Sequence, residues 1–350
     1  MKLIFLATSG SIHSYRWVDF FLKQDYEVIW ISFDKKLYDP PKHVEYIEIN
    51  HNRIISLVKC LFKIRSIKPS LIHAHYVGYY GLAALLSKYR YIITPWGSDL
   101  LLNKTNFFKK LFISLILRNS ELVTYDGENI KREISQYGIK ERKIRNIKFG
   151  IDTKKFSNIN TQKTNQFRIV STRVLDDIYD LKTLIKSFAI VLRKFPNSDL
   201  FIANDGKLRN NLQRQAAKLG IKDRVFFTGK VPNDKMPEFL SEMDIYVSTA
   251  LSDGGLSCST AEAMSCELPV VISNSSDNAQ WVKDKYNGML FDCKNHEMLA
   301  AKIIYLFQNS EIMRSIGQRG RKEIVSKFNL TKEKKKMMDI YDGFLIKPIS

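Results

Sequence analysis

The chain has few cysteines and no long apolar run, and each absence excludes a class of protein. Its four cysteines, at positions 60, 258, 266 and 293, form no C-x-x-C pair. A disulfide framework is therefore not expected, and a reduced, cytoplasmic protein fits best. No apolar run reaches the roughly 18 residues that span a bilayer. The opening "MKLIFLATSG" has too short an apolar core for a signal peptide and lacks a small-residue cleavage pattern, so we interpret it as a buried strand.

Acidic residues are scarce in one long segment. Between Glu48 and Glu121 the only acidic residue is Asp99. The basic residues of the same segment are Arg53, Lys59, Lys63, Arg65, Lys68, Lys88, Arg90, Lys104, Lys109, Lys110 and Arg118. The formal net charge of the whole chain is +19, which favours polyanions, anionic lipid surfaces or phosphorylated substrates. A basic nucleic-acid-binding protein is therefore one alternative, although zinc-finger and basic-zipper spacings are absent and the basic residues are spread along the chain.

Short apolar runs alternate with helical patterns along the chain. "KLIFLAT" and "EVIWISF" are typical of buried strands, whereas "RIISLVKCLFKIRSI" has helical spacing. Strands that alternate with helices predict βαβ units and parallel sheets, whose strands are apolar on both faces. The pattern restarts after the polar segment "NIKFGIDTKKFSNINTQKTNQ", which we interpret as a linker. The sequence therefore predicts an α/β protein with two Rossmann-like, doubly wound domains.

We place the N-terminal domain at residues 1–155 and the C-terminal domain at 156–329. A terminal helix within 330–350 is expected to pack back on the N-terminal domain. Ligands of open α/β sheets bind beyond the carboxyl ends of the strands. Functional residues should therefore follow strands, and two such domains facing each other would leave a central cleft.

The segment "LSDGGLSCSTAEAMSCELPVVIS" has the features of an anion site. Gly254 and Gly255 follow a predicted strand, and small residues lead into a helix that carries Glu262. Glycines let a ligand approach the backbone closely, and a helix N-terminus offers free N–H groups and a partial positive charge. A carboxylate in the first turns of that helix can accept two hydroxyls, as a ribose presents them. The alternative is an ordinary loop with a capped helix and a solvated Glu262.

The motifs, taken in order, resemble those of glycosyltransferase family four, whose members are retaining enzymes of the GT-B fold. The C-terminal half carries "STRVL", "DLKTLIKSF", "LFIANDG", "DRVFFTGKV", "MPEFLSEMDIYVSTA", "SDGG", "AEAMSCELPVVIS" and "NGMLF". The N-terminal half carries "SIHSYRWVDFF", "LIHAHYVGYYGLAALL", "ITPWGSDLL" and "KFGIDTKKF". The resemblance covers nearly the whole chain and implies the GT-B arrangement of two Rossmann-like domains that face a central cleft.

The resemblance implies a donor site for a nucleotide-diphosphate sugar, with a UDP-sugar as the expected donor. Glu262 would hold the ribose hydroxyls, Arg173 would neutralise the leaving diphosphate, and Asp253 would contact hydroxyls of the donor sugar. The other donor-binding residues would be Gly254, Gly255, Leu256 and Ser257, which present backbone N–H groups, together with Lys182, Gly206, Gly229 and Gly10.

Two acidic positions depart from the family pattern. Asp253 and Glu262 have eight residues between them where the family usually has seven, so Gly254 occupies the matching place. Gln280 stands where a Glu is frequent. These departures bear on the identity of the donor sugar more than on the reaction class.

A third departure concerns the charge on the diphosphate. Tyr179 stands where the family usually has a lysine, and Lys182 or Lys207 are the candidates to replace it. The chain also lacks an Asp-x-Asp motif, which transferases of the other major fold use to hold a divalent ion. The absence of this motif fits a metal-free mechanism in which arginine, lysine and a helix N-terminus carry the charge of the leaving group. No cofactor is expected beside the donor.

The acceptor is assigned to the N-terminal domain. Asp99 follows a predicted strand and could act as a base or as a partner of an acceptor hydroxyl. With Arg173 and Asp253 it makes up the predicted catalytic residues. Asp99 also precedes a helical run, so it is compatible with an N-cap. The acceptor-binding residues are predicted to be His13, Arg16, His75 and Trp96. The two histidines of "IHAHY" share a face of a strand, and for these rings and Trp96 packing is the alternative.

The predicted function is a metal-independent, retaining glycosyl transfer to a saccharide or lipid-linked acceptor in the synthesis of cell-surface polysaccharide or lipopolysaccharide. The alternatives on the same fold are a nucleotide-sugar epimerase and a non-catalytic binder of sugar nucleotides. A cytoplasmic location is expected, with peripheral contact at the inner face of an anionic membrane. Of two basic helical segments, we interpret 53–68 as an ordinary sheet-covering helix and 106–119 as membrane-facing.

Overall fold

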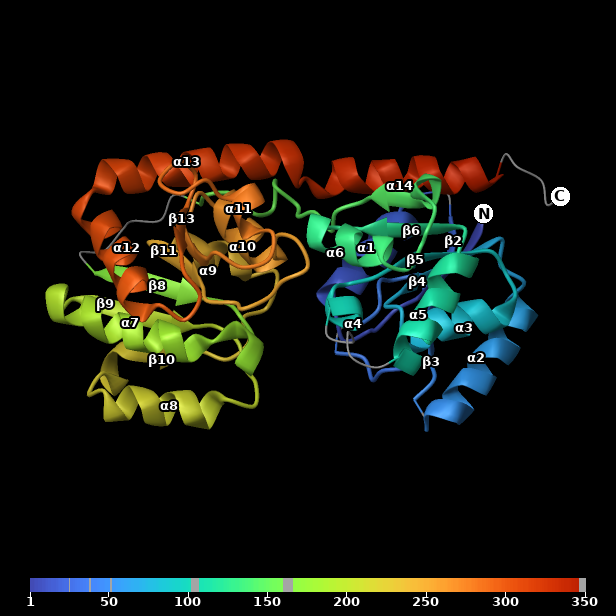
Figure 1. The fold of residues 1–350 in the computed structure, drawn as a ribbon, viewed down its shortest axis with the longest axis horizontal. Helices are drawn as coiled ribbons and strands as arrows, with labels where there is room; N and C mark the ends of the chain where they lie inside the picture. Colours follow the sequence, from blue (N-terminus) through green and yellow to red (C-terminus); the bar gives the residue numbers. More distant parts are fainter. Residues whose placement is uncertain (25, 38, 51, 102–106, 160–165, 346–350) are drawn as a thin grey trace. The chain divides into compact units, whose positions relative to one another are not determined.

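The computed structural model describes residues 1–24, 26–37, 39–50, 52–101, 107–159 and 166–345. The chain divides into two compact units. Unit 1 comprises Met1–Phe149 and the chain from Lys332 onward, and unit 2 comprises Gly150–Thr331. Each unit contains a parallel sheet covered by helices, which confirms the predicted α/β class (Figure 1). Within the described ranges, no helix is long and apolar enough to cross a membrane.

The described part of unit 1 has a seven-stranded sheet in the order β3-β2-β1-β4-β5-β6-β7, and every neighbouring pair is parallel. Its strands are β1 Lys2–Leu6, β2 Glu27–Ser32, β3 Glu45–Glu48, β4 Leu71–His75, β5 Tyr91–Thr94, β6 Leu122–Tyr125 and β7 Ile144–Asn146. Its helices are α1 Ile12–Leu22, α2 Arg53–Ile67, α3 Tyr79–Ser87, α4 Ser98–Leu101, α5 Phe107–Asn119, α6 Glu128–Ser135, the 3-10 turn η1 Glu141–Lys143 and α14 Leu330–Leu345.

The two faces of the unit 1 sheet have separate apolar cores. Successive side chains of a strand point to opposite faces, so Leu3 and Phe5 of β1 belong to one core while Ile4 and Leu6 belong to the other. The first core also contains side chains of α1 and α14. The second contains side chains of α2, α3, α5 and α6. The sheet is therefore covered on both sides, as continuous apolar strands require.

Buried polar contacts join α14 to the sheet. The Nδ1 atom of His73 is hydrogen-bonded to the hydroxyl of Tyr341, and its Nε2 atom lies 2.6 Å from Oγ1 of Thr94. Lys334 is fully buried, and its Nζ donates to the carbonyl oxygen of Arg16. Burial lowers the pKa of Lys334 well below its usual value. The terminal helix α14 thus supplies hydrogen-bond partners for the ring of His73 and for the carbonyl oxygen of Arg16.

The described part of unit 2 has a six-stranded parallel sheet in the order β10-β9-β8-β11-β12-β13. Its strands are β8 Phe167–Ser171, β9 Ser198–Ile202, β10 Val225–Phe227, β11 Ile245–Ser248, β12 Val270–Ser273 and β13 Met289–Phe291. Its helices are η2 Asp177–Tyr179, α7 Leu181–Lys194, α8 Arg209–Lys218, η3 Lys222–Arg224, α9 Met236–Ser241, α10 Cys258–Ser265, α11 Asn278–Trp281, α12 His296–Gln308 and α13 Ser310–Lys327.

Each sheet has one pair of neighbouring strands whose following helices pack on opposite faces of the sheet, and we call this pair the reversal point. In unit 2, α7 follows β8 and packs on one face, whereas α10 follows β11 and packs on the other. Because β8 and β11 are neighbours, the loops that leave them diverge and open the edge of the sheet. In unit 1 the neighbours β1 and β4 are placed in the same way, since α1 and α3 lie in different cores.

A close helix contact in unit 2 gives the first prediction. A Cβ atom at Gly317 of α13 would overlap the carbonyl oxygen of Glu267, whereas one at Gly343 of α14 would meet open space. Gly317→Ala should therefore lower the free energy of unfolding by about 1–3 kcal/mol, while Gly343→Ala should leave it unchanged or raise it by up to about 1 kcal/mol. Urea unfolding of the two variants measures both changes, and equal stability would contradict the packing of α13.

The buried histidines predict a pH dependence of stability. Burial lowers the pKa of His75 from its usual 6.5 to about 3 and that of His73 well below 6.5. The unfolded chain therefore takes up protons first as the pH falls below 6.5. The stabilising contribution of neutral His75 is full above pH 6.5 and falls between pH 6.5 and 3 by about 1.4 kcal/mol per pH unit, and His73 acts in the same direction.

Urea unfolding at pH 7.5 and pH 5 tests this dependence. His75→Gln removes one of the groups that titrate on unfolding, so its loss of stability between the two pH values should be smaller than that of the wild type. His43→Asn, at an exposed position, is the matched control and should behave as the wild type. An unchanged dependence in His75→Gln would show that His75 does not contribute.

Candidate functional site

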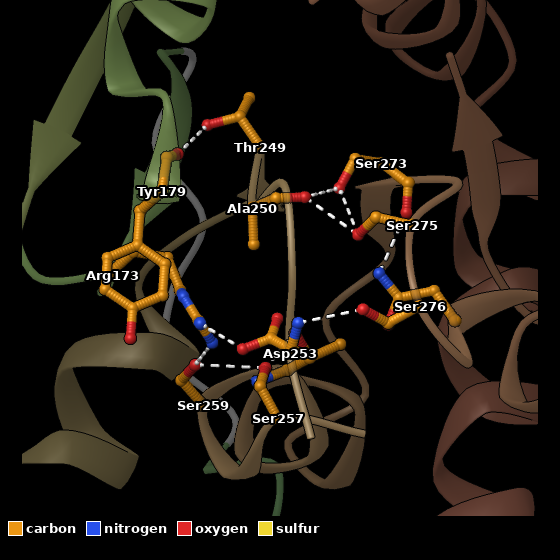
Figure 2. Close-up of polar contacts among 12 residues, drawn as sticks. Arg173, Tyr179, Thr249, Ala250, Asp253, Ser257, Ser259, Ser273, Ser275 and Ser276 are labelled. Atoms are coloured by element: carbon orange, nitrogen blue, oxygen red, sulfur yellow. Dashed lines mark hydrogen bonds and ion pairs between the residues drawn. The ribbon is translucent and has the colours of Figure 1, made fainter. Parts of the chain in front are cut away.

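The predicted residues Arg173 and Asp253 meet at the reversal point of the unit 2 sheet. Arg173 follows β8, and Asp253 lies in the loop between β11 and α10. Nη2 of Arg173 donates to Oδ1 of Asp253 at 2.5 Å, and Nη1 donates to Oγ of Ser259 at 3.0 Å (Figure 2). The guanidinium carbon lies 4.2 Å from the ring centroid of Tyr179. The arginine is therefore fixed in one orientation by an acid, a hydroxyl and an aromatic face.

Further hydroxyl groups contact the Ser259 hydroxyl that binds Arg173. The hydroxyl of Tyr246 donates to Oγ of Ser259 at 3.0 Å, and Oγ of Ser257 lies 3.3 Å from the same atom. Ser257 is the N-cap of α10 and accepts from the backbone N–H of Thr260. Sequence reasoning predicted Ser257 but missed Ser259 and Tyr246. The run "SCST" at the helix start was the available signal for Ser259.

The loop that carries Asp253 is held by its neighbours. Oγ1 of Thr249 donates to the carbonyl oxygen of Tyr179 at 2.6 Å. The hydroxyls of Ser273 and Ser275 donate to the carbonyl oxygen of Ala250 at 2.5 and 2.8 Å. The N–H of Asp253 donates to the hydroxyl of Ser276 at 3.0 Å (Figure 2). Contacts from η2, from the end of β12 and from the loop after β12 therefore hold the loop that carries this carboxylate.

The electrostatics of the pair follow from burial. Burial lowers the pKa of Arg173, but Asp253, Tyr246 and Tyr179 together outweigh this effect and the net change is upward. Burial raises the pKa of Asp253, and Arg173 opposes that rise. Nε of Arg173 is buried and has no hydrogen-bond partner among the described residues. A buried N–H group without a hydrogen-bond partner costs free energy, so Nε is suited to donate a hydrogen bond to an oxygen of a ligand.

The other donor-site predictions lie in the same loop and helix. Gly254 and Gly255 follow Asp253, and Gly255 has a left-handed φ of 79°. The side chain of Leu256 is buried in the core, so this residue can offer only its backbone to a ligand. Glu262 is buried within α10.

Three further donor-site predictions lie in the loop after β9, in the loop after β10 and on α7. A Cβ atom at Gly206 would lie 2.5 Å from the carbonyl oxygen of Leu175, so only glycine fits there. Gly229 has a left-handed φ of 75° and open space around it. Lys182 is exposed on α7. The alternative Lys207 forms surface ion pairs with Asp176 and Asp177.

In unit 1, three predicted acceptor residues lie together. Nε1 of Trp96 donates to Nδ1 of His75 at 3.0 Å, and the rings of Trp96 and His13 are 5.8 Å apart. Phe149 packs against both His13 and Trp96 and was not predicted. Burial lowers the pKa of His13 to about 3. Nε2 of His75 is buried without a hydrogen-bond partner in the described part of the chain.

Two further predicted residues lie around this cluster. Gly10 is in the loop after β1, where its N–H donates to Oγ1 of Thr8 at 3.1 Å. Arg16 is on α1, one turn beyond His13, and its carbonyl oxygen accepts a hydrogen bond from Nζ of the buried Lys334.

Asp99 joins two loops at the edge of the unit 1 sheet. Its Oδ2 accepts from the backbone N–H of Val77 at 2.8 Å, and its Oδ1 accepts from those of Trp96 and Gly97 at 3.0 Å each. Burial raises the pKa of Asp99, against the lowering effect of these N–H groups. The carboxylate therefore fixes the loop after β5, which carries Trp96, to the loop after β4. Among the described residues, no group of three or more histidines, cysteines and acids could hold a metal ion.

Comparison with known proteins finds glycosyl transferases as relatives of both units. The chain is 24% identical over 243 residues to the uncharacterized glycosyltransferase MJ1069 of Methanocaldococcus jannaschii, a match that spans 67% of this chain and 62% of that protein. It is 25% identical over 152 residues, 43% of this chain and 38% of the relative, to an Escherichia coli enzyme named UDP-Gal:alpha-D-GlcNAc-diphosphoundecaprenol alpha-1,3-galactosyltransferase. The chain thus spans about three fifths of the first relative's length and less of the second.

A solved structure shows the same fold. Anabaena Alr3699/HepE, determined in complex with UDP-glucose, superposes with a TM-score of 0.84 at 16% identity and covers 98% of this chain and 100% of its own. The sequence model of glycosyl transferases group 1 matches residues 152–323, and that of glycosyl transferase 4-like proteins matches residues 2–127. The chain therefore belongs to the group 1, family-four-like glycosyl transferases of the GT-B fold.

Proposed function

We propose that this protein transfers a sugar, with retention of configuration, from a UDP-sugar to a saccharide or lipid-linked acceptor in the synthesis of a cell-surface polysaccharide. The observation that carries the proposal is the buried Arg173, which the loop after β11 and the start of α10 hold in place and whose Nε remains without a hydrogen-bond partner among the described residues. Such a group suits a diphosphate that gains charge as it leaves.

Relatives support the choice of donor and acceptor. The E. coli enzyme is named for a UDP-galactose donor and a diphosphoundecaprenol-linked acceptor, and HepE was crystallised with UDP-glucose. We assign the ribose hydroxyls to Glu262, the diphosphate to Arg173 and the backbone of residues 254–257, and hydroxyls of the donor sugar to Asp253. The ion pair between Arg173 and Asp253 then sets the position of the diphosphate relative to the sugar.

The reaction requires one bond to break and one to form. The bond from the anomeric carbon to the diphosphate oxygen breaks, and its electron pair leaves with the diphosphate. The oxygen of an acceptor hydroxyl bonds to the same carbon, and its proton passes to an oxygen of the departing diphosphate. One preorganised donor at the diphosphate contributes about 3–4 kcal/mol to lowering the barrier, and Arg173 is the donor that we assign to this task. Mg²⁺ is not required in this proposal.

We assign acceptor binding to His13, Arg16, His75 and Trp96 in unit 1. Trp96 offers an aromatic face to a sugar ring, and His75 offers a buried Nε2. Asp99 orients these groups through the backbone of the Trp96 loop and supplies a carboxylate next to the acceptor hydroxyl.

Nucleotide binding provides a direct test of the donor site. A panel of nucleotide diphosphates and nucleotide sugars, with UDP first, should raise the melting temperature of the wild type equally with and without Mg²⁺. A ligand at 100 times its dissociation constant adds about 2.7 kcal/mol of stability. Glu262→Ala should lose this shift, whereas Glu238→Ala, at an exposed position of α9, should keep it. If no nucleotide stabilises the wild type while DNA does so at low salt, the protein is a nucleic-acid binder instead.

Arg173→Lys separates charge from geometry. Lysine keeps the charge but cannot bond Asp253, Ser259 and a ligand in the planar fork of arginine. We expect kcat/KM to fall about 10²–10³-fold in a sugar-transfer assay. Arg214→Lys, on the exposed face of α8, should match the wild type.

The products of that assay decide between the remaining functions. A new glycosidic product supports transfer, and an altered nucleotide sugar or a free sugar released without acceptor indicates an epimerase. Nucleotide binding with no turnover for any donor indicates a non-catalytic binder.

A further inference from the structure

Three neighbouring helices of unit 1 form an outer layer that the proposed transfer does not explain. The helix α3 packs against both α2 and α5, and all three contribute to one core under the sheet (Figure 1). A Cβ atom at Gly81 of α3 would lie only 2.9 Å from Cγ2 of Ile116 of α5, so these two helices are in close contact. The outer sides of the three helices therefore belong to a single surface, which we call the α2–α3–α5 face.

The side of α2 that points away from the core carries a line of apolar side chains. Its buried residues are Ser56, Cys60 and Ile64. Ile54, Val58 and Phe62 recur every four residues on the other side, with exposed fractions of 76%, 46% and 65%. A helix on a water-facing surface normally places polar residues there. The helix α2 therefore has apolar side chains both toward the core and toward the outside.

The helix α5 has the same property. Its buried residues are Ile113, Ile116 and Leu117. Phe107 and Phe108 are 73% and 79% exposed at its start. Leu111 and Leu115 continue the exposed line four and eight residues beyond Phe107. Clustered exposed apolar side chains on one face indicate an interaction surface.

The charge of this face identifies its partner. No aspartate or glutamate occurs in α2, α3 or α5, while α2 carries Arg53, Lys59, Lys63 and Arg65 and α5 carries Lys109, Lys110 and Arg118. Aromatic and aliphatic side chains enter the boundary of a bilayer, and lysines and arginines beside them attract anionic headgroups. A protein partner would have to supply many acids around an apolar centre.

We propose that the α2–α3–α5 face docks on the surface of an anionic lipid bilayer. Ile54, Phe62, Phe107 and Phe108 enter the interface, and the surrounding lysines and arginines contact lipid phosphates. This docking extends the expected membrane role of segment 106–119 to α2, whose sequence alone favoured an ordinary covering helix. It does not depend on the identity of donor or acceptor.

Vesicle co-sedimentation of the full-length protein tests the proposal without any nucleotide. The wild type should bind vesicles of phosphatidylcholine mixed with phosphatidylglycerol and bind pure phosphatidylcholine much more weakly. Ile54→Ser/Phe62→Ser and Phe107→Ser/Phe108→Ser should each weaken binding at least about tenfold. Lys109→Ala/Lys110→Ala should also weaken binding and reduce its dependence on salt.

Two controls make the result specific. Leu219→Ser/Phe226→Ser removes side chains of unit 2 that are 43% and 42% exposed, and it should bind vesicles as the wild type does. All variants should keep the wild-type melting temperature and its shift with nucleotide, so a failure of docking is distinguished from a failure of the donor site.

Three outcomes would overturn the proposal. The first is no binding to anionic vesicles, and the second is equal binding by the serine variants and the wild type. The third is self-association of the wild type, measured by sedimentation equilibrium, that the Phe107→Ser/Phe108→Ser variant abolishes while vesicle binding persists. That result would assign the face to a second copy of the chain.

Discussion

A parallel sheet brings the carboxyl ends of all its strands to one edge, and both units depend on this constraint. In unit 2 it places Arg173, which follows β8, beside the loop after β11 that carries Asp253. In unit 1 it places His13, His75 and Trp96 together, although 83 positions separate His13 from Trp96 in the sequence. Because neighbouring strands at the reversal point send their helices to opposite faces, the edge is open there. The same geometry thus produces a candidate site in each unit.

The buried charge of Arg173 in unit 2 has an acidic partner. Removing an arginine from water is costly unless it is paired, and Asp253 supplies the pair at 2.5 Å. Tyr179 adds an aromatic face where the family usually has a second cation. The site therefore holds its cation in a neutral pair before any ligand arrives. The orientation of Arg173 is already determined before a diphosphate binds, so this side chain loses little conformational entropy on binding.

Periodic, buried elements were predictable from the sequence, and sparsely buried or irregular ones were not. The segment 53–67 was predicted as a helix and is α2 from Arg53 to Ile67, because its apolar spacing is helical throughout. The strand β3, Glu45–Glu48, was missed, since it is short and has a charged residue at each end. The helix α6 was also missed, because charged and polar residues dominate its sequence.

The sites show a similar division. Arg173 and Asp253 were identified through the family motifs, but Tyr246 was not, since a tyrosine within an apolar strand resembles core. The partners of Asp99 were also beyond sequence reasoning. Val77 lies 22 positions before Asp99 and comes into reach only through the pairing of β4 with β5.

The return of the chain to unit 1 at Lys332 has a consequence for how the protein is made. A ribosome synthesises the described strands of unit 1 before unit 2, yet Met337 and Tyr341, which complete one of the cores of unit 1, emerge only after unit 2. Until then His73 lacks its Tyr341 partner, and Phe21 lacks one of the aromatic rings that pack on it. Unit 2 has all its residues between these two parts and can finish folding first. The order in which the units are completed is thus the reverse of the order in which they begin, and a nascent chain released before α14 would leave unit 1 with an open apolar face.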